Sequence, residues 1–194
     1  MERKFAFTFI GAFLAFWLLT GTQTSSARHR HHRHHHRRHT VAVAKIAMDS
    51  CASDEIAQLS SMLGVQLDTC CDTKLMLTLA GWLGTPYHHA GYSKKGIDCS
   101  GFVSKIYKDV YGLDLTHSAC SMITQMHECV NKDELREGDV LFFKIHGKRS
   151  RISHVGIYLK NNKFIHASSY RGIVVEDLTL PYYKQRFYKA GRVM

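Results

Sequence analysis

One cysteine at the predicted start of a helix and two histidines further along the chain are the residues with the clearest chemical potential. Cys99 stands in the segment GIDCSGFVSKIYKDVYG, residues 96–112. His154 and His166 stand in the segments SHVGIYL and KFIHAS. A thiolate is a strong nucleophile, a nearby imidazole can serve as its base, and a further polar group can orient that imidazole. The three residues predict nucleophilic acyl transfer if the fold brings them together.

The segment after Cys99 predicts the helix that carries it, with Gly112 as the residue that ends it. Apolar residues recur there at helical spacing: Phe102, Val103, Ile106, Tyr107 and Val110. Because Phe102 and Val103 lie three and four residues after Cys99, the thiol shares the face that packs into the protein. Free N–H groups and the positive end of the helix dipole favour a thiolate there and can stabilise an oxyanion.

The histidines lie on predicted strands. Strands are expected over residues 140–145, 153–159 and 163–168, with further β segments over 172–176 and 187–193. Two helices, over about 53–64 and 73–83, come earlier in the chain. Helices followed by a meandering antiparallel sheet of about five strands predict an α+β domain.

The turn between the two histidine strands decides whether these residues can cooperate. A two-residue loop at Asn161-Asn162 would place His166 opposite Ile157, and the two histidines would then point to opposite faces. A three-residue turn over 160–162, with Asn162 in the left-handed conformation, instead pairs His166 with Gly156. His154 is then a diagonal neighbour of His166 at roughly 7 to 8 Å, which two imidazoles can bridge. The three-residue turn or an equivalent bulge is therefore predicted.

The N-terminal part of the chain predicts export. A basic start, an uncharged apolar run over 5–21 and the small residues Ser25-Ser26-Ala27 are typical of a signal peptide over residues 1–27. The alternative is an uncleaved membrane anchor, although the run is at the short limit for crossing a bilayer. We expect a periplasmic or cell-wall location.

The Arg/His-rich tract over residues 28–39 explains much of the charge. It holds five Arg and seven His, and it supplies half of the net +10 that 26 Lys+Arg and 16 Asp+Glu give the 194-residue chain. Nucleic acid is therefore not an expected partner. Such a tract cannot fold by itself, so residues 28–50 are predicted to be a tail and linker and residues 51–194 a single catalytic domain. The tract is either a solvated spacer or a contact for a metal ion or an anionic wall polymer.

The other roles of the cysteines and histidines remain open at this stage. In an exported protein a disulfide is a common fate of cysteine, and the chain offers partners in Cys51, Cys70, Cys71, Cys120 and Cys129. Spacing does not decide their pairing. Cys99 with His154 and His166 could also form a metal site, but a thiol at a helix start favours catalysis, and no metal or cofactor is predicted.

Three stretches together resemble the NlpC-type cell-wall cysteine peptidases: PYHHAGYSKKGIDCSGFV, LREGDVLFF and ISHVGIYLKNNKFIHAS. The resemblance runs from about residue 81 to the C-terminus. It implies a papain-like fold, a helix with the nucleophile packed on an antiparallel sheet, and cleavage of peptide bonds in peptidoglycan stem peptides. The chain departs from the family pattern with His89, where an aromatic residue is usual, and with Ala90 before Gly91, where two glycines are usual. These departures concern the shape of the substrate cleft.

The resemblance also implies roles for individual residues. Cys99 matches the nucleophile, His154 the base and His166 the orienting residue. Beside the nucleophile, the family motif places Tyr87, Asp98 and Ser100 as oxyanion or substrate-binding residues.

The resemblance leaves the cleaved bond open. A crosslink between D-Ala and the diamino acid, the bond between D-Glu and the diamino acid, and a related amidase or acyltransferase reaction are all compatible with it. A non-catalytic wall- or metal-binding protein is a further alternative. A monomer is expected.

Overall fold

The computed structural model describes residues 52–193. The predicted signal peptide, residues 1–27, and the predicted tail and linker, residues 28–50, lie outside the described residues, as does Cys51. Within the described part of the chain, no helix combines the length and the apolar character needed to cross a bilayer.

The helices agree closely with the sequence pattern. Residues 52–63 are helical and end at Gly64, whose φ of 63° is a left-handed conformation that glycine adopts without strain. Helix α2 (Thr73–Ala80) is capped by Asp72 and is three residues shorter than predicted, because residues 81–84 form a turn. Helix α3 (Cys99–Tyr111) starts at the nucleophile candidate and ends at Gly112, with φ 72°. Two short helices, α4 (Ala119–Met122) and α5 (Pro181–Arg186), were not predicted.

The main sheet has six strands instead of the predicted five or so, in the order β3-β8-β4-β5-β6-β7, and every pairing is antiparallel. Its strands are β3 (Glu128–Val130), β4 (Val140–Phe143), β5 (His154–Tyr158), β6 (Lys163–Ser168), β7 (Gly172–Asp177) and β8 (Phe187–Arg192). The extra strand is β3, a short edge strand paired with β8. A separate hairpin joins β1 (Tyr92–Ser93) to β2 (Gly96–Ile97), and short 3-10 turns cover Ile123–Gln125 and Lys132–Glu134.

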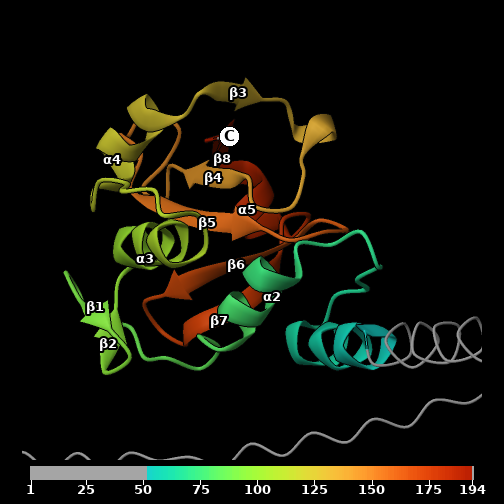
Figure 1. The fold of residues 1–194 in the computed structure, drawn as a ribbon. Coiled ribbons are helices and arrows are strands. Elements are labelled where there is room, and N and C mark those ends of the chain that lie inside the picture. The colour runs from blue at the N-terminus through green and yellow to red at the C-terminus, as the bar shows by residue number, and fades with distance from the viewer. Residues whose placement is uncertain (1–51, 194) are drawn as a thin grey trace, which may run out of the picture. The chain divides into compact units, whose positions relative to one another are not determined.

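The sheet is covered on both faces (Figure 1). Alternate residues point to opposite faces of a strand, so Phe142 packs with the core that includes Phe102 of α3, whereas Phe143 packs with the core that includes Tyr183 of α5. Phe102, Phe142 and Phe143 are fully buried. This packing holds the start of α3 and the helix α5 in fixed positions around strands β5 and β6.

The β5–β6 turn has the predicted register. Ile157 pairs with Ile165 and Tyr158 with Phe164, so residues 160–162 form the loop, and the same register aligns Gly156 with His166. Asn162 has φ 60° and Asn161 has φ 51°, both in the left-handed region that asparagine tolerates. The prediction of a three-residue turn is confirmed, and His154 and His166 therefore share one face.

Candidate active site

Asp98 fixes the start of helix α3. Its Oδ1 accepts hydrogen bonds from the Gly101 N–H at 2.7 Å and from the Ser100 hydroxyl at 3.0 Å. Its Oδ2 accepts one from the Ala90 N–H at 3.0 Å. The carboxylate thus caps the helix and ties the preceding loop to it, which holds Cys99 at the first helical position.

The Cys99 thiol is buried, and this burial changes the expected chemistry. Burial, with a smaller contribution from the nearby charge of Asp98, raises the pKa of Cys99 to about 11. The backbone N–H groups of Ser100 and Cys99 at the helix start and that of Val155 on β5 act in the opposite direction, but they do not outweigh burial. Burial therefore favours the thiol form of Cys99 at neutral pH, against the effect of the helix start.

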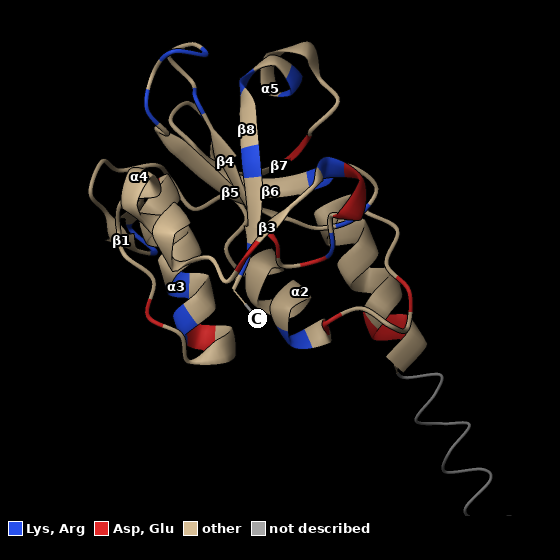
Figure 2. Cartoon of the chain, turned by 90° about the horizontal axis from the view of Figure 1, so that it is seen from above, with Lys and Arg blue, Asp and Glu red and all other residues tan. Residues whose placement is uncertain are grey.

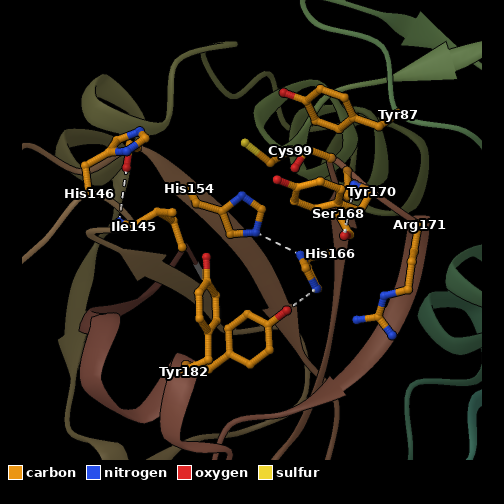
Figure 3. A pocket seen from close by; sticks show the side chains of 14 residues that line it. Tyr87, Cys99, Ile145, His146, His154, His166, Ser168, Tyr170, Arg171 and Tyr182 are labelled. Carbon is orange, nitrogen blue, oxygen red and sulfur yellow. Dashed lines mark hydrogen bonds between the residues drawn. The ribbon is translucent and has the colours of Figure 1, made fainter.

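The two histidines form a direct hydrogen bond. His154 Nε2 lies 2.8 Å from His166 Nδ1, and the ring planes are nearly perpendicular at 89° (Figure 3). Burial lowers the pKa of His154 to about 4, and burial together with the His154 ring lowers the pKa of His166 well below its usual value. Both rings are consequently neutral at pH 7. Since Nε2 of His154 is engaged by His166, its Nδ1 is the ring nitrogen left for a reacting group.

Tyr183 continues this chain of hydrogen bonds, and sequence reasoning missed it. The Tyr183 hydroxyl lies 3.2 Å from His166 Nε2, on the far side of the ring from His154. His166 is only 2% exposed, so little water can compete for this position. Burial, the largest effect, raises the pKa of Tyr183 to about 12, which keeps its hydroxyl protonated. The segment PYYKQR carries no motif that pairs a tyrosine with a distant histidine, and only the packing of α5 on the sheet shows the contact.

The proton positions along this chain follow from the chemistry required of His154. If His154 Nδ1 is to accept a proton, its Nε2 must carry one and donate it to His166 Nδ1. His166 must then carry its proton on Nε2 and donate it to the Tyr183 oxygen. The donated hydrogen bonds therefore run in one direction, from His154 to His166 and from His166 to Tyr183, and leave His154 Nδ1 free to accept a proton on the side of the cysteine.

Two hollows meet at Cys99, and both are lined by Tyr87, Cys99, His146 and Ser153. The first, of about 510 Å³, extends along His154 and His166 toward Tyr170 and Tyr182 (Figure 3). The second, of about 770 Å³, extends along Asp98, Ser100 and His117. A chain-like ligand can thus lie on both sides of the thiol, as a peptide substrate requires.

The remaining predicted site residues divide into two kinds. Tyr87 lines both hollows, and its pKa is raised by burial and by the nearby Cys99 and Asp98. The Ser100 hydroxyl donates to Asp98 and lies 3.0 Å from the His117 carbonyl oxygen, so it holds the helix start in place. Asp98 and Ser100 therefore position the nucleophile, whereas Tyr87 faces the open space beside it.

The positions that depart from the family pattern lie in the loop before α3. Ala90 has φ 57°, a left-handed conformation that costs an alanine more than a glycine. Gly91 is needed where it is, because a Cβ there would come within 2.5 Å of the Gly96 carbonyl oxygen. His89 lines the second hollow.

Disulfides and a metal site were further possibilities for the cysteines and histidines of the chain. Cys70, Cys71, Cys99, Cys120 and Cys129 are all free thiols, so none of the disulfides considered among these described residues is formed. Across residues 52–193, no group of three or more His, Cys, Asp or Glu side chains has the geometry to hold a metal ion.

A cysteine at the start of a helix, packed on an antiparallel sheet that carries the histidine pair, agrees with the family resemblance of the sequence. Residues 84–192 match the NlpC/P60 family, and the chain belongs to that family. A solved NlpC/P60 family protein from Bacillus cereus ATCC 10987 has 30% sequence identity and a TM-score of 0.58, over 65% of this chain and 41% of that one. The papain-like α+β fold is therefore confirmed.

Two curated relatives are similar over the same region. The murein DD-endopeptidase MepS/murein LD-carboxypeptidase of Escherichia coli (strain K12) is 39% identical over 122 residues, which is 63% of each chain. The probable endopeptidase NlpC of the same strain is 42% identical over 118 residues, covering 59% of this chain and 73% of that protein. The match to the first relative thus spans slightly less than two thirds of its length.

Proposed function

We propose that the protein is a cysteine peptidase that hydrolyses peptide bonds in peptidoglycan stem peptides. The observation that carries the proposal is the 2.8 Å hydrogen bond between His154 and His166 in the hollow that also contains Cys99. Membership of the NlpC/P60 family and the names of the two relatives, both endopeptidases and one a murein endopeptidase, support the reaction class and the substrate.

The first half of the reaction forms a thioester. As the Cys99 sulfur attacks the carbonyl carbon of the scissile bond, its proton moves to Nδ1 of His154. The backbone N–H of Cys99 stabilises the resulting oxyanion, with the Tyr87 hydroxyl as a second donor. The C–N bond then breaks, and the leaving amine takes the proton from His154.

The second half of the reaction releases the acid product. Water loses a proton to His154 as it attacks the thioester carbon, and the C–S bond breaks to return the thiol of Cys99. His166 orients the imidazole and stabilises its protonated form during both halves. Because the resting thiol and imidazole are both neutral, the ion pair forms only as the reaction proceeds.

Digestion of purified sacculi by the purified exported chain tests this proposal. The Cys99→Ala variant should abolish release of soluble fragments, whereas Cys129→Ala, which removes an exposed thiol from β3, should leave it unchanged. If the Cys99→Ala variant still releases fragments, the proposed chemistry is wrong. If neither the native chain nor the variant releases them but both bind sacculi, the protein is a wall-binding member of the family.

The bond that is cleaved is a finer proposal. We favour the crosslink between D-Ala and the diamino acid, in line with the DD-endopeptidase name of the first relative. Mass spectrometry of the released fragments separates this bond from the D-Glu to diamino acid bond and from products of an amidase or acyltransferase. A periplasmic or wall-associated location follows from the proposed substrate and from the predicted signal peptide.

A further inference from the structure

A cluster of unpaired cations lies beside the proposed catalytic groove. We name it the basic rim and define it by Lys144, Lys148, Arg149, Arg151, Lys184 and Arg186. The first four lie in the β4–β5 loop and the last two in α5. The loop residues 144–153 and the segment 181–192 contain no Asp or Glu. Figure 2 shows these blue positions at the same end of the molecule.

One backbone hydrogen bond and one side-chain hydrogen bond bring the two segments of the rim together. The Lys144 N–H donates to the Arg186 carbonyl oxygen at 2.9 Å. In return, Arg186 Nε donates to the Ile145 carbonyl oxygen at 3.2 Å. The rim is therefore one surface formed by two distant parts of the sequence.

The rim cations lack carboxylate partners, whereas half of the other Lys and Arg side chains in the described part of the chain have one. Within the described residues, Lys105, Lys108, Lys160, Lys163, Arg171 and Arg192 each form an ion pair. None of the rim cations does so within residues 52–193. Lys148, Arg149, Arg151 and Lys184 are also exposed, so their charges are available to an external anion.

A hollow of about 670 Å³ separates the two halves of the rim. It is lined by Lys148 from the loop and by Lys184 and Gln185 from α5, together with Thr179, Pro181 and Phe187. The carboxylate nearest in sequence, Asp177, already accepts hydrogen bonds from Thr179 and is paired with Lys163. Two lysines and an amide across one hollow are suited to a carboxylate ligand.

The rim is connected to the catalytic groove through shared elements. In the loop, His146 lines the groove and Lys148 lines the rim hollow. In α5, Tyr182 and Tyr183 line the groove and Lys184 lines the rim hollow. A branched polymer held at Cys99 could therefore reach the rim with a second branch.

Resting on the proposed function, we propose that the basic rim binds the free carboxylates of a second peptidoglycan stem peptide while the first occupies the catalytic groove. The rim would then favour the polymer over small fragments of it, because only the polymer presents a further stem peptide beside the crosslinked pair that enters the groove. An anionic lipid surface fits less well. The exposed rings at the rim, Tyr182 and Tyr188, each have a cation over one face, Arg186 at 4.0 Å and Lys144 at 4.1 Å, which makes them less suited to insert into a bilayer.

The test compares two charge-matched double variants of the full exported chain. Lys148→Gln with Lys184→Gln removes two rim charges, and Lys95→Gln with Lys132→Gln removes two unpaired lysine charges elsewhere. Binding to sacculi is measured in the Cys99→Ala background, and turnover of sacculi and of a small soluble crosslinked muropeptide is measured with Cys99 present. The rim variant should bind sacculi roughly 3- to 10-fold more weakly than the control, with a difference that disappears near ~0.5 M salt. Turnover of the small muropeptide should be unchanged.

Equal sacculus binding by the two double variants would overturn the rim proposal. Loss of binding to phosphatidylglycerol vesicles with sacculus binding retained would also overturn it and would assign the rim to an anionic lipid surface. Failure of the proposed function is seen separately, as absence of turnover by the chain with Cys99 present, while the binding measurement still reports on the rim.

Discussion

Replacing Tyr183 by Phe removes one hydroxyl from the hydrogen-bond chain and leaves the ring that packs against Phe143 and Phe164. His166 then loses the acceptor at its Nε2, 3.2 Å away, in a place where it is 2% exposed and where water cannot easily substitute. A lost neutral hydrogen bond with a buried unsatisfied partner costs about 1 to 2 kcal/mol. If this cost falls on the transition state, kcat drops roughly 5- to 30-fold.

The expected split between kinetic constants follows from where Tyr183 acts. It is a positioning residue that acts through His166, so kcat should fall while KM for a soluble muropeptide stays near the native value. His166 without its acceptor is a weaker partner for protonated His154, so the acid limb of the kcat/KM profile should move to lower pH.

Tyr107→Phe is the matched control, because it removes another buried tyrosine hydroxyl, one that donates to the Gly138 carbonyl oxygen outside the site. It should lower the free energy of unfolding and leave both the kcat and the pH profile unchanged. If Tyr183→Phe shows native kcat and a native pH profile, the proposed role of the hydroxyl is refuted. The same holds if the two variants lose activity only in proportion to their lost stability.

Three further predictions concern the same region. The pKa values of His154 and His166 are lowered on folding, so the unfolded chain binds more protons below pH 6.5, and the free energy of unfolding should fall as the pH drops from 6.5 to about 4. Urea denaturation at several pH values should show that this free energy depends less steeply on pH in the double variant His154→Asn with His166→Asn. Gly156→Ala should destabilise the fold by ~1 to 3 kcal/mol, since its Cβ would come within 2.9 Å of the Ile165 carbonyl oxygen and 3.1 Å of His166 Cβ; an unchanged denaturation midpoint would contradict this. Asp98→Asn should shift alkylation of Cys99 by iodoacetamide to lower pH, because it removes a charge that raises the thiol pKa; an unshifted profile would show that burial alone sets it.

Much of the fold follows from local sequence patterns. The helical spacing after Cys99 located α3, and Gly112 marked its end because a left-handed residue terminates a helix without strain there. Strand periodicity predicted that His154 and His166 share one face of the sheet if the turn has three residues, and asparagine tolerates the left-handed conformation that this turn requires. The edge strand β3 was not predicted, because a three-residue strand has too few positions to show alternation.

The features that sequence could not supply depend on packing between distant segments. The sequence places Cys99 on the packed face of its helix, but it does not indicate how far burial beneath the sheet raises the thiol pKa. Tyr183 is 17 residues from His166, and their contact exists only because α5 folds back over the sheet. The same return of α5 brings Lys184 and Arg186 beside the basic β4–β5 loop, a proximity that the order of residues in the sequence does not reveal.

The three-residue β5–β6 turn has an implication for how this chain can vary. Inserting or deleting one residue there would send His166 through to the opposite surface and separate it from its partner, although the strand itself could still pair. Among functional descendants, substitutions at Asn161 and Asn162 should therefore be far more common than changes in the length of this short connection.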